Sequence, residues 1–157
     1  KIFIYILMSI NNWGPATWNL LHTLSYKIKE EHFEMQKEKL IYFLTNICNN
    51  LPCPDCTKHA RLFLQKINIK NIKTKNDYIL VVFTLHNEVN IRLKKAKQEY
   101  DIVHSYDNYK LRNIIINFIN KFQVKGNMKM LSNTFHRTQL LNEFMEWVKK
   151  NISYFNE

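Results

Sequence analysis

The residues with the clearest chemistry are Cys53 and Cys56, a Cys-x-x-Cys motif with Pro52 and Pro54 on either side of the first cysteine. The segment Thr57–Ile67 follows with apolar residues at helical spacing, so we expect the pair at the start of a helix. Proline is tolerated in a first helical turn, and the partial positive charge of a helix N-terminus favours a thiolate. Two cysteines at this spacing can close a small disulfide, which is the basis of a redox-active dithiol.

A metal site is the competing interpretation of the same cysteines. A structural zinc ion needs four ligands, and the chain has three cysteines. Cys48, Cys53, Cys56 and His59 would complete a set of three cysteines and one histidine. The cysteine spacing also matches part of an iron–sulfur motif, but no fourth cysteine follows. The cysteines alone therefore leave redox chemistry and metal binding open.

Length and composition favour one all-α domain, with an appendage at most. The chain has 157 residues, of which 46% are hydrophobic, enough for a substantial core. It has two glycines and three prolines, so tight turns and β-hairpins are disfavoured. The net charge of +10 comes from scattered lysines rather than from a basic stripe with aromatics, so we expect no nucleic-acid binding.

We also expect no membrane span. The apolar run Ile2–Leu7 is too short to cross a bilayer and has no signal-peptide cleavage pattern after it. Met8 is a candidate natural start, and residues 1–12 are therefore treated as a separate N-terminal segment.

Apolar periodicity predicts a succession of helices along the chain. The expected segments are Pro15 to Lys29, Glu34 to Asn49, the segment from the cysteine pair to Ile67, a helix capped by Asn76 or Asp77, Asp107 to Phe122, and a helix from Ser132 or Asn133 to Lys150. The best linker is Val124–Asn127, which contains the second glycine. The last two helices each have a wide apolar face that must pack on the core, on each other or on a partner subunit. Their use is either that of a structural cap or that of shaping a groove beside Cys53.

Polar and aromatic side chains form stripes on two of these helices. On the first, Trp18, His22 and Tyr26 are spaced four residues apart. On the fourth, three polar residues lie close together: His86, Asn87 and Asn90. Inward-facing polar groups need partners, which a heteroaromatic cofactor or an internal network would supply. Each stripe by itself favours ordinary burial over a cofactor site.

Three motifs in order make a more specific pattern. They are Trp13-Gly14-x3-Trp18-x2-Leu21-His22, then Cys53-x2-Cys56, then His86-Asn87-x-Val89-Asn90-x2-Leu93-x-Lys95. Together they resemble the Erv/ALR family of FAD-dependent sulfhydryl oxidases. The resemblance covers about Trp13 to Tyr100, and short viral members have similarly few cysteines.

The resemblance implies a four-helix bundle that binds FAD, with a short fifth helix and usually a homodimeric assembly. Residues 13–106 would form this domain, and 107–157 a helical C-terminal extension. The flavin would be bound by Trp18, His22, Tyr26, His59, His86, Asn87, Asn90 and Lys95, and by an aromatic residue that is either Tyr100 or Tyr106. The substrate would attack Cys53, and Cys56 would lie beside the flavin. Cys48 would be a buried apolar residue or would pair across a dimer.

The implied reaction oxidises a protein dithiol, such as a thioredoxin-like or virion protein, and reduces O2 to H2O2. The family's separate shuttle cysteines have no counterpart here. A viral member would act in the host cytoplasm or virion, and otherwise the mitochondrial intermembrane space is expected. Other interpretations stay open: a non-catalytic helical module with a metal at Cys48, Cys53, Cys56 and His59, a flavin-free dithiol exchanger, or an inactive homologue that serves as a scaffold.

Overall fold

The computed structural model describes the backbone of residues 2–123 and 131–157, and the side chains of residues 11–123 and 134–157. The described residues are helical apart from their connections and an isolated bridge between Ile28 and Phe155, which confirms the predicted all-α class. The predicted linker Val124–Asn127 lies outside the described residues.

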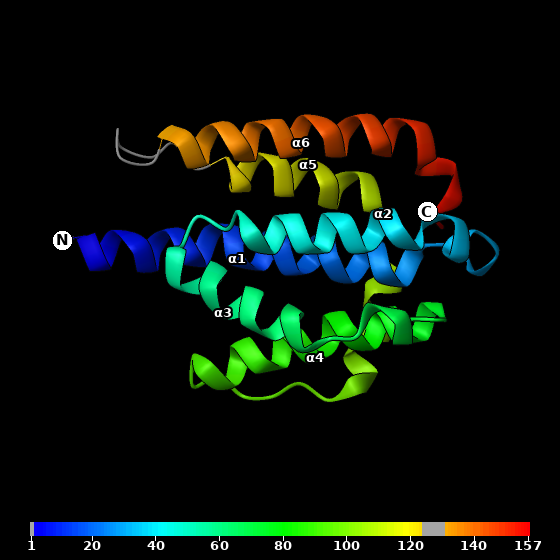
Figure 1. The fold of residues 1–157 in the computed structure, drawn as a ribbon, viewed down its shortest axis with the longest axis horizontal. Coiled ribbons are helices and arrows are strands. Elements are labelled where there is room, and N and C mark those ends of the chain that lie inside the picture. The colour runs from blue at the N-terminus through cyan, green and yellow to red at the C-terminus, as the bar shows by residue number, and fades with distance from the viewer. Residues whose placement is uncertain (1, 124–130) are drawn as a thin grey trace.

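The helices form three layers (Figure 1). The central layer holds α1 (Ile2–Lys27) and α2 (Glu30–Asn49), which cross between the other two layers. On one side lie α3 (Pro54–Lys66) and α4 (Lys75–Arg92), and on the other α5 (Leu111–Phe122) and α6 (Leu131–Asn151). The shorter 3-10 helices are η1 (Ile69–Asn71), η2 (Tyr100–Asn108) and η4 (Ile152–Tyr154).

The first helix is longer than predicted. We expected it to begin at Pro15, but α1 begins at Ile2 and includes Gly14 and Pro15 in its interior. A proline inside a helix removes one backbone hydrogen bond, here the one to the carbonyl of Asn11, yet α1 continues through Pro15. Residues 2–12, expected as a separate segment, are therefore continuous with the helix that carries Trp18 and His22.

Side-chain caps define where the helices α3 and α4 begin. Cys53 is the N-cap of α3, and its Sγ accepts a hydrogen bond from the backbone N–H of Cys56 at 3.2 Å. The predicted cap of α4 was wrong: Thr74, rather than Asn76 or Asp77, is the N-cap. Asp77 sits at the third helical position and completes a capping box, because its carboxylate accepts the N–H of Thr74.

A single hydrophobic core joins all three layers. Phe43 of α2 packs edge-on against Phe144 of α6 at 5.2 Å between ring centroids, and Phe118 of α5 contacts the same ring. The residues predicted to face inward on α2, α5 and α6 are buried or packed against this core: Leu40, Phe43, Leu44, Ile47, Leu111, Ile114, Ile115, Phe118, Phe122, Leu140, Leu141, Phe144, Trp147 and Val148. The C-terminal helices thus pack on α1 and α2 rather than forming a core of their own.

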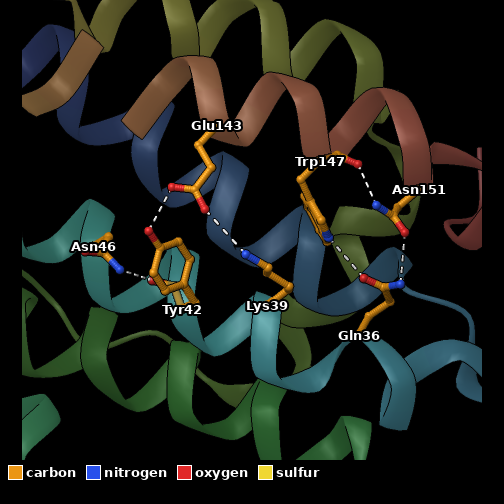
Figure 2. Close-up of polar contacts among 7 residues, drawn as sticks. All are labelled: Gln36, Lys39, Tyr42, Asn46, Glu143, Trp147 and Asn151. Carbon is orange, nitrogen blue, oxygen red and sulfur yellow. Dashed lines mark hydrogen bonds and ion pairs between the residues drawn. The ribbon is translucent and has the colours of Figure 1, made fainter. Parts of the chain in front are cut away.

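Polar contacts fix α6 against α2 (Figure 2). The indole of Trp147 donates to the side-chain oxygen of Gln36 at 3.0 Å, and the Gln36 amide donates to Asn151 at 3.0 Å. Nearer the surface, Tyr42 donates to the carboxylate of Glu143 at 2.8 Å. These bonds set the register of α6 along α2.

Among the described helices, none combines the length and the apolar character needed to cross a bilayer.

Candidate functional site

Cys53 and Cys56 are joined by a disulfide at the start of α3, as their spacing predicted. Their Cα atoms lie 5.2 Å apart. Cys53 is only 5% exposed, whereas Cys56 is partly exposed and lines a cavity. The two sulfur atoms of the disulfide therefore have different surroundings.

The cavity has a volume of about 270 Å³ and lies between α1, the start of α3 and the end of α4. Its walls are mostly apolar. The sequence-predicted residues that the fold brings together on these walls are Trp18, Cys56, His86, Asn90 and Lys95. Residues from three separate motifs thus meet around one space.

Aromatic contacts connect α1 to α4 at the cavity. Trp18 stacks on His86 with ring centroids 4.1 Å apart and an angle of 11° between the planes. His22 is buried behind this pair, and its Nε2 lies 2.9 Å from Nδ1 of His86. The α1 stripe therefore contributes Trp18 directly and His22 through His86.

Both histidines are neutral near pH 7. Burial, and then the neighbouring His86, lowers the pKa of His22 to about 3. Burial, and then the charge of Lys95, lowers the pKa of His86 to about 4. Nδ1 of His22 is buried with no hydrogen-bond partner among the described residues, so a proton there would be an unpaired donor. The favoured tautomer has His22 Nε2–H donating to His86, which leaves the His86 proton on Nε2.

Tyr106 is the aromatic residue of η2 that belongs to the cavity. It lines the wall and stacks on His22 at 4.6 Å with an interplanar angle of 10°. Tyr100, the other candidate, is 38% exposed and contacts Phe83. The sequence left this choice open because both residues precede the same segment.

The C-terminus of α4 positions Lys95. Lys94 has a φ of 56°, in the left-handed region that glycine usually occupies after a helix. The N–H groups of Lys94 and Lys95 return to the carbonyls of Ile91 and Asn90 at 3.0 and 2.8 Å. This reversal, a Schellman motif, directs the chain back so that Lys95 lines the cavity.

Besides His22, three predicted flavin-binding residues do not line the cavity. The Asn87 amide exchanges two hydrogen bonds with the backbone of Gln98, at 3.0 and 2.9 Å, and so holds the segment after α4. Tyr26 lies 3.3 Å from Nδ1 of His104 through its hydroxyl. His59 is exposed and lines a separate groove of about 210 Å³, which shares Val89 and Arg92 with the cavity.

The sequence reasoning missed other residues of the cavity wall. Trp13 was part of a motif but was given no role, and Arg92 was not considered. Trp13 Nε1 and Arg92 Nε are buried without a hydrogen-bond partner among the described residues. Trp13 lies one turn before Thr17 on α1, and Arg92 lies two residues after Asn90 on α4, so their place beside the motif residues was the available signal. An anionic or acceptor-rich ligand would satisfy the two buried nitrogen atoms.

Cys48 also lines the cavity and is a free, buried thiol, which confirms the prediction that it is buried. Burial raises its pKa to about 12, so it stays protonated and unreactive near neutral pH. No group of three or more His, Cys, Asp or Glu side chains within the described part of the chain has a metal-binding arrangement.

Comparison with known proteins places residues 15–114 within the sequence model of the Erv1/Alr family. This match covers most of the cavity wall, the disulfide and η2, and it stops early in α5.

Several individual proteins are similar to the same region. An FAD-linked sulfhydryl oxidase of African swine fever virus is 32% identical over 84 residues, which is 54% of this chain and 70% of the viral protein. A probable FAD-linked sulfhydryl oxidase of fowlpox virus is 36% identical over 95 residues, covering 55% of this chain and 93% of that protein. The FAD-linked sulfhydryl oxidase ERV1 of Arabidopsis thaliana is 29% identical over 82 residues, covering 52% and 42%. No solved structure gave a significant match.

Proposed function

Since the chain belongs to the Erv1/Alr family, we propose that it is an FAD-linked sulfhydryl oxidase. It joins the thiols of a dithiol substrate into a disulfide and passes the electrons to O2. The observation that carries this function is the position of Cys56, which faces the same cavity as the stacked pair Trp18 and His86. The disulfide and the stacked aromatic pair therefore border one cavity.

The cavity residues fit FAD. Its apolar and aromatic walls suit a flavin ring, for which Trp18 and His86 would supply the stacking and hydrogen-bonding surface. The cations Arg92 and Lys95 would hold the pyrophosphate, and that acceptor-rich group would satisfy the unpartnered Nε of Arg92. When bound, FAD supplies a two-electron acceptor that O2 reoxidises with formation of H2O2.

The protein's own chemistry is thiol–disulfide exchange. A substrate thiolate attacks Sγ of Cys53, the Cys53–Cys56 bond breaks, and Cys56 leaves as a thiolate facing the cavity. A second substrate thiolate then attacks the substrate sulfur of the mixed disulfide and releases the Cys53 thiolate. The substrate has lost two electrons and two protons, and the cysteine pair has gained the two electrons. Oxidation of the pair restores the disulfide.

The first step requires access to Cys53. Because this cysteine is 5% exposed, we expect substrate binding to open the loop 51–53 that precedes α3. Cys56 needs no such movement, since it already faces the cavity. The unequal surroundings of the two sulfur atoms support separate roles, with Cys53 exchanging with substrate and Cys56 meeting the flavin.

The neutral histidines orient the site without carrying charge. His22 Nε2–H holds the His86 ring through Nδ1, which leaves a donor at Nε2 of the residue that lines the cavity. Asn90 adds an amide to the same wall. These groups would orient the cofactor's ring heteroatoms, and Tyr106 would close the site by its stack on His22.

The substrate, assembly and compartment follow from the family resemblance. We propose a protein dithiol as substrate, of thioredoxin-like or virion type. A homodimer stays a prediction, and a second copy would have to pack on a face other than the one that α5 and α6 cover on α1 and α2. The host cytoplasm, the virion and the mitochondrial intermembrane space remain the predicted compartments.

The test is a visible spectrum and an oxygen electrode. Protein purified with FAD supplied is expected to be yellow, to release FAD on denaturation, and to consume O2 when dithiothreitol is added. A chelator should leave turnover unchanged. Colourless, chelator-sensitive protein would instead support a metal-binding module at Cys48, Cys53, Cys56 and His59. Disulfide exchange without bound flavin would support the flavin-free exchanger.

A further inference from the structure

A second hollow lies beside the redox-active loop, where the end of α2 and the start of α3 approach α6. This α3–α6 groove has a volume of about 470 Å³. Leu51 lines both the groove and the flavin cavity, and Pro54, which follows Cys53 directly, lines the groove. A molecule bound in the groove would therefore lie next to the disulfide.

The groove is cationic. Lys58 and Arg61 line it from α3 and Arg137 from α6, and no carboxylate is part of its lining. Arg61 donates its Nε to the side-chain oxygen of Asn49 at 3.3 Å, a neutral partner. The ion pairs between described residues involve other lysines, namely Lys37, Lys39 and Lys149. The positive charge of the groove is thus left for a partner to neutralise.

Arg137 places a buried guanidinium in the wall of the groove. Its side chain is 2% exposed, and its Nε is buried without a hydrogen-bond partner among the described residues. One other guanidinium nitrogen donates to the hydroxyl of Thr134 at 3.3 Å. A buried guanidinium without a carboxylate is unfavourable, and a carboxylate accepts two parallel hydrogen bonds from it. The geometry therefore favours a carboxylate ligand at this point.

We propose that the α3–α6 groove binds an acidic segment of the protein whose dithiol is oxidised at Cys53, a proposal that rests on the function above. The net charge of +10 would attract such a partner over a distance. Nucleic acid is less suited, because the groove lining includes no aromatic side chain on which a base could stack. Arg137 lies outside the family match, so α6 adds this recognition element to the shared core.

Binding and turnover test the proposal separately. The binding probe is a fluorescent peptide, Ser-Gly-Gly-Ser followed by four glutamates, and its control carries four glutamines. With the FAD-loaded full chain at low salt, anisotropy is expected to show at least tenfold tighter binding of the glutamate peptide. Arg137→Gln and Arg61→Gln should each remove most of this preference, and Lys149→Gln, at the exposed end of α6, should not. Arg61 is exposed, so its variant tests the groove even if Arg137→Gln fails to fold.

Turnover uses the same peptides with both serines replaced by cysteines. Oxygen uptake is expected to give a kcat/KM at least tenfold higher for the glutamate dithiol, while dithiothreitol oxidation is equal in wild type and both arginine variants. Equal binding of the two probe peptides would overturn the proposal, as would a preference that survives in both variants. Tighter binding of a single-stranded oligonucleotide, lost in Arg61→Gln, would assign the groove to nucleic acid. Failure to oxidise dithiothreitol would contradict the proposed function alone, because the anisotropy result stands without it.

Discussion

Trp147 of α6 donates its indole N–H to the side-chain oxygen of Gln36 on α2, at 3.0 Å in the buried contact between these helices (Figure 2). The bond joins residues that are 111 positions apart in sequence. Because this hydrogen bond is buried, the effect of removing it on the free energy of unfolding tests whether the C-terminal helices are part of the folded core.

The variant Trp147→Phe is expected to destabilise the protein by about 1–3 kcal/mol, because it leaves the Gln36 oxygen buried without its donor. Urea unfolding measures the change. Tyr42→Phe is the matched control: it removes a hydrogen bond to Glu143 at the exposed edge of the same contact, and should cost less than about 0.5 kcal/mol. Equal effects of the two variants would mean that α6 is not held by this bond.

The two cysteines are expected to respond differently to substitution. Cys53→Ser and Cys56→Ser should each abolish dithiol-driven oxygen uptake, since exchange requires both sulfur atoms. Only Cys53→Ser leaves a thiolate at the cavity wall, so only this variant should show a long-wavelength charge-transfer absorbance with bound flavin. Cys48→Ser should keep near-normal turnover, because the raised pKa of Cys48 keeps its thiol protonated. The absorbance in Cys56→Ser instead would reverse the assigned roles.

Tyr106→Ala is expected to weaken FAD binding about tenfold, which corresponds to about 1.4 kcal/mol, through loss of its stack on His22 and of its part of the cavity wall. Tyr106→Phe should retain most of the affinity. Tyr100→Ala is the matched control, since Tyr100 is exposed and contacts Phe83 away from the cavity. Titration of the flavin-free protein with FAD, followed by flavin fluorescence, gives the affinities; a larger loss in Tyr100→Ala would show that the two tyrosines were assigned wrongly.

The His22–His86 pair predicts a loss of stability in mild acid. Both residues have an ordinary pKa of 6.5 when unfolded, and burial lowers the folded values to about 3 and about 4. Below pH 6.5 the unfolded chain therefore binds more protons than the folded protein does. The free energy of unfolding is thus highest above pH 6.5 and falls as the pH decreases toward 4. Urea unfolding of the flavin-free protein from pH 7.5 to 4.5 should show this slope.

The variant His22→Gln should flatten the slope, because glutamine keeps a hydrogen-bonding group toward His86 without titrating. His136→Gln is the control, as that histidine is exposed on α6 and lies away from the cavity. An unchanged slope in His22→Gln would mean that other groups cause the acid sensitivity.

The sequence by itself determined the helical class and the inward faces of the helices. Apolar spacing identified Leu40 and Phe43 on α2 and Phe118 on α5, because a helix repeats its face every three to four residues regardless of what covers it. The Cys-x-x-Cys pair was placed at the start of α3 for a similarly local reason, since the apolar run of Thr57–Ile67 follows it directly. Two residues of separation also suffice for the disulfide. The three motifs in order also identified five residues that meet at the cavity.

The tertiary structure decided which neighbour each face meets. Periodicity predicts which side of α5 and of α6 is buried, but it does not predict that these helices cover α1 and α2. For the same reason, nothing in the sequence indicated that Arg137 lies in a groove beside the loop of Cys53. Tyr26 follows the same stripe as His22, yet it lies against His104, because a stripe spans more of a helix than one cavity does. Tyr106 rather than Tyr100 reaches His22 because the backbone reversal at Lys94 and the Asn87 contacts fix the path of η2. Such choices depend on contacts between segments distant in sequence, and local spacing carries no information about them.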